Sequence, residues 1–370
     1  MPISMSTPDP VDLAEALHLT RSGRLAEATA AIQRALGGAS RSHSPVPNCR
    51  ANPGRVHGAP LRSLPPMPPM RPGAGLGVDL SSLPRLDRLP GLDGLPGLAG
   101  GTAPATSRPY RLHVPTQLPP GPRPLVVLLH GGTQDSAAFA QATGFDAFAD
   151  AHGFLALYPE QITAANPMRY WNWFNRADQQ RDAGEPSILV GLVEQVAAEH
   201  PIDRDRVYVA GFSAGAAMAS VLGAVYPDVF AGIGVHSGLA HGAAGDMVSA
   251  FSAMGRAPLV PAVDHIPAII IHGDADPTVH VSNAGSVLEQ FAPVGATRRT
   301  VAEQVNGRHI QRTILETDRR TVSECIVISG AGHTWSGGRP GGSYADPSGP
   351  DATAEMIRFF GLASGDAGKI

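Results

Sequence analysis

The sequence contains little that would cross-link the chain or place it in a membrane. Only two cysteines occur among its 370 residues, Cys49 and Cys325. Cys49 lies in a stretch rich in Pro and Gly, and Cys325 lies in an apolar, strand-like run. We therefore expect a free thiol and a buried small side chain rather than a disulfide framework. No apolar run reaches the roughly 18 residues of a membrane span. Residues 1–10 have no basic segment followed by an apolar one, so no classical export signal is visible.

Charged residues are also few, and their distribution argues against a nucleic-acid partner. Lys, Arg, Asp and Glu make up 16% of the chain, and the formal net charge is −4. Residues 1–123 contain 13 Arg and 7 acidic residues, a net charge of +6, whereas the remainder has a net charge of −10. A nucleic-acid enzyme requires a basic face on its folded part, and here that part is acidic. We expect no nucleic-acid partner and interpret the basic head as a solvated segment.

Three segments differ in their composition and pattern. Residues 1–39 have a helical period interrupted at Ser22-Gly23, which predicts a small helical hairpin with a docking or dimerisation role. Residues 40–107 have no period and are dominated by Pro and Gly, so they cannot bury enough apolar surface to fold and predict a disordered linker. Residues 108–363 alternate short apolar runs with helical patterns. This alternation predicts an α/β domain with a mostly parallel sheet and helices on both faces.

The apolar patterns of this third segment also locate its elements. Strands are expected at residues 110–114, 124–132, 154–158, 206–210, 233–236, 268–272, 309–315 and 325–328. Helices are expected at residues 137–152, 186–199, 214–224, 283–291 and 351–360. In open sheets of this kind, active sites lie beyond the carboxyl ends of the strands. The candidate site residues all follow such ends.

A candidate nucleophile lies between an expected strand and an expected helix. Residues 211–215 read Gly-Phe-Ser-Ala-Gly, and an alanine-rich helical pattern follows at once. This context, strand then tight turn then helix, is typical of a nucleophile elbow. Small residues must flank the serine because its backbone is strained, and Gly211 and Gly215 satisfy that requirement. The sequence predicts Ser213 as the nucleophile.

A serine hydroxyl needs a base, and the base needs a supporting acid. In α/β-hydrolases these residues follow in the order Ser, acid, His. Two aspartates follow the expected strand at 268–272, and we predict Asp276 as the acid because it lies deeper in the loop, whereas Asp274 stabilises the turn. His333 follows the last apolar strand in a Gly-rich loop and is predicted as the base. His236 and His272 are expected to be core histidines.

Two backbone N–H groups are needed to stabilise the oxyanion of a tetrahedral intermediate. Ala214 provides one from the start of the helix. The loop after the strand at 124–132 provides the second, from Gly132 or Thr133, because glycine allows the backbone to approach the substrate closely.

The three tryptophans lie beside these motifs. Trp171, Trp173 and Trp335 fall in loops, and they predict an aromatic substrate-binding rim. The alternative is that Trp171 and Trp173 pack a lid region. No His, Cys and acidic residues have metal-ligand spacing, and no phosphate-binding or dinucleotide glycine motif is present. We therefore expect no metal and no cofactor.

Several stretches, taken in chain order, resemble the polyhydroxybutyrate depolymerase-like esterases of the α/β-hydrolase superfamily. They are Leu129–Gln134, Tyr158–Gln161, Trp171–Phe174, Gly184–Pro186, Arg206–Met218, His236–Leu239, His272–Val279 and Gly332–Gly338. The helical head also looks like the leader of some bacterial members. The resemblance implies the α/β-hydrolase fold, a triad of Ser213, Asp276 and His333, and a short-chain hydroxyalkanoate polyester or a small ester as substrate.

The chain departs from this family at two positions. Members often have Cys where this chain has Gly132 and Tyr170. A joint change is expected if the two positions form a disulfide elsewhere, and its loss fits a reducing compartment. The resemblance implies an extracellular location, whereas the lack of a visible signal leaves the cytoplasm as the alternative.

The sequence thus predicts a serine carboxylesterase that forms an acyl-enzyme on Ser213 and hydrolyses poly(3-hydroxybutyrate). The alternatives are a feruloyl, acetyl or general short-chain carboxylesterase and, from another class, a non-catalytic binder of polyester granules. The expected partners are a polyester or small ester substrate and a second copy or a granule at the N-terminal hairpin.

Overall fold

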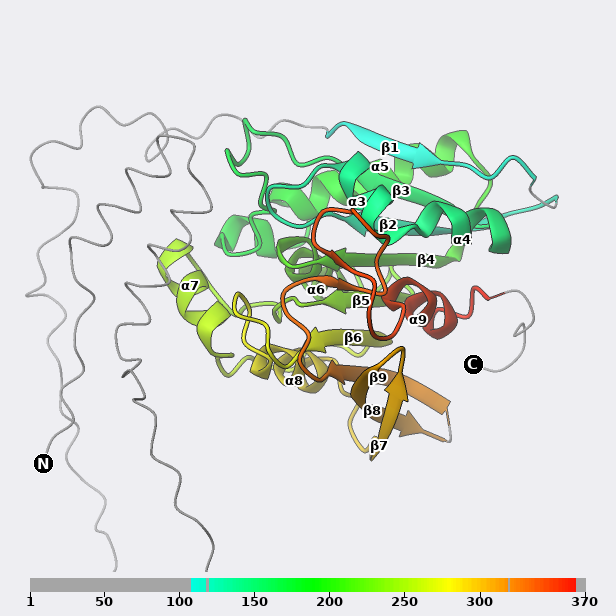
Figure 1. The fold of residues 1–370 in the computed structure, drawn as a ribbon. Helices are drawn as coiled ribbons and strands as arrows, with labels where there is room; N and C mark the ends of the chain where they lie inside the picture. Colours follow the sequence, from blue (N-terminus) through cyan, green and yellow to red (C-terminus); the bar gives the residue numbers. More distant parts are fainter. Residues whose placement is uncertain (1–107, 118–119, 319, 364–370) are drawn as a thin grey trace, which may run out of the picture. The chain divides into compact units, whose positions relative to one another are not determined.

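The computed structural model describes residues 108–117, 120–318 and 320–363 (Figure 1). The hairpin predicted over residues 1–39 and the linker predicted over residues 40–107 lie outside this part of the chain. The domain expected over residues 108–363 is the part that the structure describes.

The described elements alternate between strands and helices. In chain order they are β1 (Tyr110–His113), β2 (Arg123–Leu129), α3 (Ser136–Thr143), α4 (Phe145–His152), β3 (Leu155–Pro159), η3 (Arg176–Gln179), α5 (Gly184–Glu199), β4 (Ile202–Phe212), α6 (Ala214–Val225), β5 (Gly232–His236), α7 (Met247–Gly255), β6 (Ala268–Gly273), α8 (Ser282–Gln290), β7 (Thr297–Val305), β8 (Arg308–Thr317), β9 (Arg320–Ile328), β10 (Trp335–Ser336), β11 (Ala345–Asp346) and α9 (Ala352–Phe359).

Strands β1 to β9 form one large sheet in the order β1-β3-β2-β4-β5-β6-β9-β8-β7 (Figure 1), whereas β10 and β11 pair with each other in a separate small sheet. The six strands from β3 to β9 are mutually parallel. β1 pairs antiparallel with β3 at one edge, and β8 and β7 extend the other edge as an antiparallel hairpin. The prediction of a mostly parallel sheet is confirmed. Because parallel strands end at a common edge, the segments that follow β2, β4, β6 and β9 meet there.

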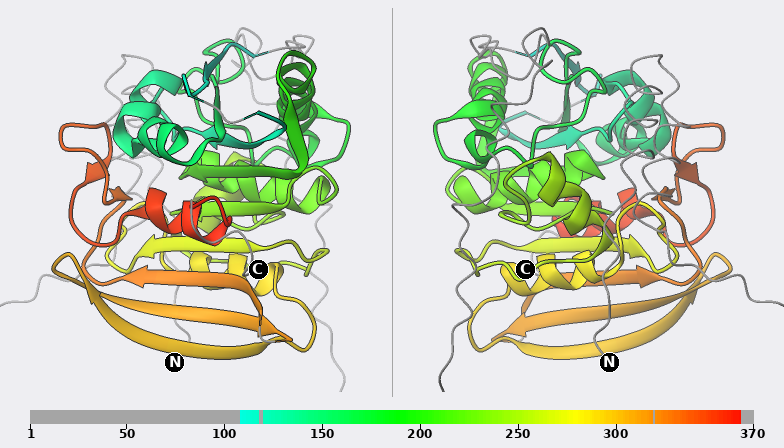
Figure 2. Two further views of the ribbon diagram at one scale, coloured as in Figure 1. Left: turned by 90° about the vertical axis from the view of Figure 1, so that its right-hand side faces the viewer. Right: turned by 90° about the vertical axis from the view of Figure 1, so that its left-hand side faces the viewer.

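Helices cover both faces of the sheet, as predicted (Figure 2). One apolar cluster contains the Leu125, Val127 and Leu129 side of β2 together with α5, α6, α7 and α8. The other cluster contains the Val126 and Leu128 side with α3, α4 and α9. The two alternating faces of β2 are both buried, which explains why its sequence is a continuous apolar run.

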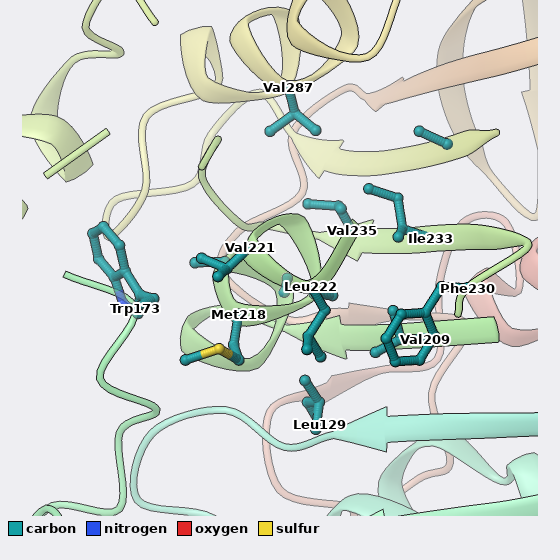
Figure 3. Packing of buried hydrophobic residues seen from close by; sticks show 14 of the residues in the cluster. Leu129, Trp173, Val209, Met218, Val221, Leu222, Phe230, Ile233, Val235 and Val287 are labelled. Atoms are coloured by element: carbon teal, nitrogen blue, oxygen red, sulfur yellow. The ribbon is translucent and has the colours of Figure 1, made fainter. Parts of the chain in front are cut away.

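Helix α6 is the most deeply buried helix of the site, with its residues from Ala214 to Gly223 all buried. Its small residues allow a close approach to the sheet, while Met218, Val221 and Leu222 fill the space around it (Figure 3). Full burial of a side chain of this size stabilises a fold by about 1.5–3 kcal/mol. This packing places the first turn of α6 firmly at the end of β4.

The helix expected over residues 137–152 is wrong as a single element. The chain forms α3 and α4 instead, separated by Gly144, which has a left-handed φ of 68°. The N–H of Gly144 donates to the carbonyl of Ala140 and ends α3. The apolar pattern continues across the break because both helices pack on the same face of the sheet.

Five described elements were not expected: η3, α7, β7, β10 and β11. Strand β7 lies at the sheet edge and its residues are exposed or half-buried, so no buried face produces an alternating apolar pattern. Helix α7 begins with a capping box between Asp246 and Ser249, a local signal that could have predicted it.

Candidate active site

Ser213 lies in the sharp turn between β4 and α6. Its backbone has φ 54° and ψ −117°, a conformation that costs energy for a residue other than glycine. The turn needs Gly215, because a Cβ there would lie 2.6 Å from the carbonyl oxygen of His130. The structure therefore has the strained elbow that the residues from Gly211 to Gly215 predict.

The structure brings together the three residues predicted as a triad, although they lie far apart in the sequence. Nε2 of His333 is 2.9 Å from Oγ of Ser213, and Nδ1 of His333 is 2.7 Å from Oδ2 of Asp276. Since a carboxylate can only accept, Nδ1 carries the hydrogen and Nε2 is left as the acceptor of the serine proton. The three side chains form one hydrogen-bonded chain that could activate Ser213.

Asp276 is placed by its own loop. Its Oδ1 accepts hydrogen bonds from the N–H groups of Thr278 and Val279, at 2.8 and 2.9 Å. Burial alone would raise the pKa of Asp276, but the hydrogen bond with His333 and the further partners outweigh it and lower that pKa below its usual value. Asp274 has another partner, since its Oδ1 accepts from the N–H of Gly330 at 2.6 Å. Asp274 thus connects its own loop to the loop after β9, and its predicted role within the turn stays a prediction.

His236 and His272 are buried behind the triad, as predicted for core histidines. His236 stacks on Trp335 and accepts a hydrogen bond from the N–H of Ser336 at 3.1 Å. Burial lowers the pKa of His236 to about 3. His272 donates from Nε2 to the carbonyl of Val279 at 2.8 Å, and burial lowers its pKa as well. Both imidazoles are therefore neutral near pH 7.

The loop after β2, residues 130–134, lies beside the elbow and is called the β2 loop below. A Cβ on Gly131 would lie 2.8 Å from the ring of Phe212, the residue before Ser213. Ala214 is the first residue of α6, so its N–H has no carbonyl one turn earlier to bind. Among the described residues no hydrogen bond engages the N–H of Gly132. These two groups are free to bind an oxyanion.

Thr133, the other candidate for the second N–H group, is already engaged. Its N–H donates to the carbonyl of Met168 at 2.8 Å. Of the two residues left open by the sequence, the structure favours Gly132. Thr133 also has a left-handed backbone, with φ 65°.

A buried carboxylate lies next to the β2 loop. Glu185, 3% exposed, accepts from Nη2 of Arg108 at 3.3 Å and from the Gln161 side chain. It also accepts from the N–H and the Nδ2 of Asn172, at 2.7 and 2.8 Å. Burial raises the pKa of Glu185 and the nearby Asp178 adds to the rise, while the hydrogen bonds from Gln161 and Asn172 and the charge of Arg108 act against it. We call Arg108, Gln161, Asn172 and Glu185 the Glu185 network.

The Glu185 network reaches the β2 loop through Gln161. The N–H of Gln161 donates to Nε2 of His130 at 3.1 Å, and its side chain donates to the carbonyl of Tyr170 at 2.9 Å. Nδ1 of His130 then donates to the carbonyl of Gly131 at 2.8 Å. Burial lowers the pKa of His130, so it stays neutral and can accept from Gln161. These bonds position the backbone immediately before Gly132.

The predicted tryptophan rim does not form. Trp171, Trp173 and Trp335 are 0%, 5% and 1% exposed. The indole of Trp171 donates to the carbonyl of His130 at 3.1 Å, and that of Trp335 donates to Oγ1 of Thr353 at 3.2 Å. Trp173 belongs to the core cluster of α6 (Figure 3). Their apolar surface stabilises the site from inside, because a large ring is most stabilising when it is buried.

Positions 132 and 170, the two departures from the family pattern, are neighbours in space. A Cβ at position 132 would lie 2.6 Å from Cζ of Tyr170 and closer still to two other ring carbons. The Tyr170 ring therefore occupies the space that a side chain at position 132 would need. The two residues depend on each other, which is a physical reason for their joint change.

Two features of the site were missed from the sequence. Gly184–Pro186 and Tyr158–Gln161 were noted only for their resemblance, although Glu185 and Gln161 connect to the β2 loop. Tyr344, whose ring lies 6.0 Å from that of Phe212, had no signal in the sequence at all.

Within residues 108–117, 120–318 and 320–363, no group of three His, Cys, Asp or Glu side chains could bind a metal ion. No helix of that part is long and apolar enough to cross a bilayer.

The fold and the site define a class. A mostly parallel sheet with helices on both faces, a strained serine at a strand–helix elbow, and an acid and a histidine from later strands are the features of an α/β-hydrolase. The family follows from direct comparison: residues 109–307 match the family described as esterase PHB depolymerase, and the chain belongs to that family.

Curated relatives are named as depolymerases and esterases, which are carboxylic ester hydrolases. Poly(3-hydroxyalkanoate) depolymerase C of Paucimonas lemoignei is 35% identical over 255 residues, which are 63% of this chain and 59% of that protein. Feruloyl esterase B of Neurospora crassa is 26% identical over 283 residues, 71% of this chain and 90% of that protein. Thus the chain spans just over half of the depolymerase.

A solved structure shows the same fold. The acetyl xylan esterase from Aspergillus awamori superposes with a TM-score of 0.58 at 20% identity, over 70% of this chain and 96% of that one. At this identity the similarity concerns the fold alone.

Proposed function

We propose that this protein is a serine carboxylesterase that hydrolyses short-chain polyhydroxyalkanoates, with poly(3-hydroxybutyrate) as the polymer. The observation that carries the proposal is the hydrogen-bonded chain from Ser213 through His333 to Asp276 at a strained elbow. Membership of the esterase PHB depolymerase family supports it. The substrate class comes from the names of the depolymerase relatives.

In the acylation step, Oγ of Ser213 forms a bond to the ester carbonyl carbon while Nε2 of His333 takes the hydroxyl proton. The carbonyl electrons move to the oxygen, which becomes an oxyanion. The carbon–oxygen bond to the alcohol then breaks, and His333 gives its proton to the departing alkoxide. Asp276 orients the imidazole and stabilises its charged form through the 2.7 Å hydrogen bond.

In the deacylation step, water attacks the acyl carbon of the ester on Ser213 and His333 takes a water proton. The bond to Oγ breaks, Ser213 regains the proton and the carboxylic acid leaves. In both steps the oxyanion is stabilised by the N–H groups of Ala214 and Gly132, one at a helix N-terminus and one in the β2 loop. Loss of one such donor typically lowers kcat by about 10²–10³-fold.

A feruloyl or acetyl esterase is the second candidate function. It is favoured by the share of length in common, because the chain matches 90% of feruloyl esterase B but 59% of depolymerase C. The same triad and the same two N–H groups would serve either substrate, since the chemistry at the ester carbonyl is identical.

The test compares wild type with Ser213→Ala on four substrates: a poly(3-hydroxybutyrate) suspension, p-nitrophenyl butyrate, methyl ferulate and acetylated xylan. Ser220→Ala is the matched control, since Ser220 is a buried serine of α6 whose hydroxyl donates to the carbonyl of Ala216. We expect serine-dependent clearing of the polymer, and no loss in the control.

Each other outcome selects a different conclusion. Serine-dependent hydrolysis of methyl ferulate or acetylxylan without clearing would favour the second candidate, and p-nitrophenyl butyrate alone would leave a general esterase. Binding of the polymer by wild type without hydrolysis would indicate a non-catalytic granule binder. Full activity of Ser213→Ala would contradict the triad.

A further inference from the structure

Two tyrosines, Tyr170 and Tyr344, lie at the β2 loop and take no part in the mechanism above. We call them the tyrosine pair. They differ from the aromatic residues predicted for substrate binding, because Tyr344 is 44% exposed and Tyr170 is partly exposed whereas the three tryptophans are buried.

Tyr344 is connected to both halves of the site. It immediately precedes β11, and its carbonyl accepts from the N–H of Trp335, two residues after His333, at 2.6 Å. Its hydroxyl lies 3.3 Å from Oγ1 of Thr133, within hydrogen-bonding distance. The neighbouring carbonyl of Ser343 accepts from Nε2 of Gln134 at 3.1 Å. Tyr344 thus contacts both the segment that follows His333 and the β2 loop.

The ring of Tyr344 is connected to the triad through Phe212. It lies 6.0 Å from the ring of Phe212, which precedes Ser213 and is itself 4.9 Å from the ring of His333. The backbone of Tyr344 has φ 55°, a left-handed conformation that is costly for a bulky side chain. A strained backbone that holds an exposed aromatic ring at a candidate site points to a functional role for that ring.

Tyr170 lies against Gly132, one of the two residues whose N–H groups are proposed to bind the oxyanion. Its ring occupies the side-chain space of Gly132, so any group bound at the N–H of Gly132 comes close to that ring. Burial raises the pKa of Tyr170, and the nearby Tyr344 adds to the rise, so the phenol stays neutral. A neutral ring offers an apolar surface to a substrate.

We propose that the tyrosine pair is the substrate-binding wall that determines chain-length preference. It packs against the apolar part of the ester that adjoins the scissile carbonyl. This inference rests on the proposed function, since the carbonyl is placed by Ser213 and the N–H of Gly132. A bound acyl or alcohol chain of several carbons then covers ring surface that is otherwise in water, and burial of apolar surface is favourable.

A purely structural role would act through the hydroxyl of Tyr344, which contacts Thr133. Two variants separate the two roles. Tyr344→Phe removes the hydroxyl and keeps the ring, whereas Tyr344→Asn removes the ring and suits a left-handed backbone. Tyr170→Leu tests the second member and keeps an apolar side chain. Val294→Asn is the control for an exposed apolar residue, because Val294 lies between α8 and β7 at the opposite edge of the sheet.

The experiment measures kcat/KM for p-nitrophenyl acetate, butyrate and octanoate, which vary the acyl chain, and for ethyl and butyl acetate, which vary the alcohol. We expect Tyr344→Asn to lower the preference for the longer chain over the shorter one by on the order of tenfold in one of the two series. Tyr170→Leu should change it in the same direction by less. Tyr344→Phe and Val294→Asn should keep the wild-type ratios.

Equal loss on all esters, or loss in Tyr344→Phe as large as in Tyr344→Asn, would overturn the proposal and leave a structural role. Wild-type ratios of kcat/KM in both Tyr344→Asn and Tyr170→Leu would also overturn the proposal, whereas the proposed function would stand. If wild type hydrolysed no ester at all, the proposed function would fail together with the wall. Thermal unfolding of each variant verifies that a change in ratio comes from folded protein.

Discussion

The two halves of the candidate site are positioned by different means. Ser213, Asp276 and His333 follow β4, β6 and β9, and the parallel pairing of the sheet brings these strand ends together. The β2 loop also follows a strand, but the placement of its backbone depends on side chains. His130, Gln161 and Glu185 form a buried hydrogen-bonded path beside it, and Trp171 donates to the same loop.

The difference concerns what each half can tolerate. A triad carried on adjacent strand ends keeps its geometry as long as the sheet is intact, because every strand is hydrogen-bonded along its length. A loop positioned by a buried polar path depends on each member, since an unsatisfied buried donor or acceptor costs about 1–3 kcal/mol. We therefore expect changes in the triad to remove chemistry without moving the fold, and changes in the Glu185 network to displace the loop.

The largest effect should follow from Asp276→Asn. The asparagine keeps the shape but can present an N–H to His333 and so favours the wrong tautomer, and we expect kcat to fall by roughly 10⁴-fold. The matched control is Asp274→Asn, in which the amide oxygen can still accept from Gly330. Measured on p-nitrophenyl butyrate, a loss in the control equal to that of Asp276→Asn would show that the acid is wrongly assigned.

A smaller effect is expected from Glu185→Gln, which changes the hydrogen bonds that position the β2 loop. An amide NH2 in this place faces donors from Asn172, Gln161 and Arg108, so at least one hydrogen bond is lost. Displacement of the β2 loop should lower kcat by roughly 10²-fold with little change in KM. The affinity for a boronic acid, which forms a tetrahedral adduct on the serine, should fall in parallel.

The control for Glu185→Gln is Glu324→Gln. Glu324 is also 3% exposed and pairs with Arg312 and Arg358 beneath α9, away from the strand ends that carry the site. We expect both variants to lose a similar amount of unfolding free energy, measured by urea unfolding. Only Glu185→Gln should lose kcat. Equal losses of kcat would show that the Glu185 network acts on activity only through overall stability.

The smallest effect is on stability and concerns His236, which is buried behind the triad. Its pKa of about 3 is below the usual 6.5, so the unfolded chain binds a proton at a pH where the folded chain does not. The free energy of unfolding should therefore decrease as the pH is lowered below about 6.5. This residue contributes up to about 1.4 kcal/mol per pH unit. In His236→Gln, whose amide oxygen can accept from Ser336, that part of the slope should disappear.

Urea unfolding at pH 6.5 and pH 5 measures this slope. Wild type should lose about 2 kcal/mol more than His236→Gln between the two values. His130, His241 and His272, whose pKa values are also lowered by burial, contribute to the residual slope. Equal slopes in wild type and variant would mean that His236 is accessible to protons in the folded protein.

Much of the fold and of the triad could be predicted because their signals are local. The apolar run of β2, the alternation of strands and helices, and the small residues around Ser213 each reflect the backbone geometry of a few neighbouring residues. The order Ser, Asp, His then placed the three side chains at one sheet edge without knowledge of any contact. The break at Gly144 and the edge strand β7 were missed because the first continues an apolar pattern and the second has none.

The remaining features of the site depend on contacts between distant segments. A tryptophan in a loop can face solvent or the core, and only packing shows that Trp171, Trp173 and Trp335 are buried. The choice between Gly132 and Thr133 depended on the carbonyl of Met168, more than thirty residues away in the chain. No pattern of Tyr344 itself marks it, since its neighbours come from the β2 loop and from Phe212.

The α/β class, the elbow at Ser213 and the acid and base candidates could all be predicted from the sequence, because backbone sterics and strand order act over short stretches. The free N–H groups, the burial of each aromatic ring and the hydrogen bonds that lead from Glu185 to the β2 loop become visible only in the folded domain. Those properties are set by which buried polar groups find partners, and the partners are brought together only when the whole domain folds.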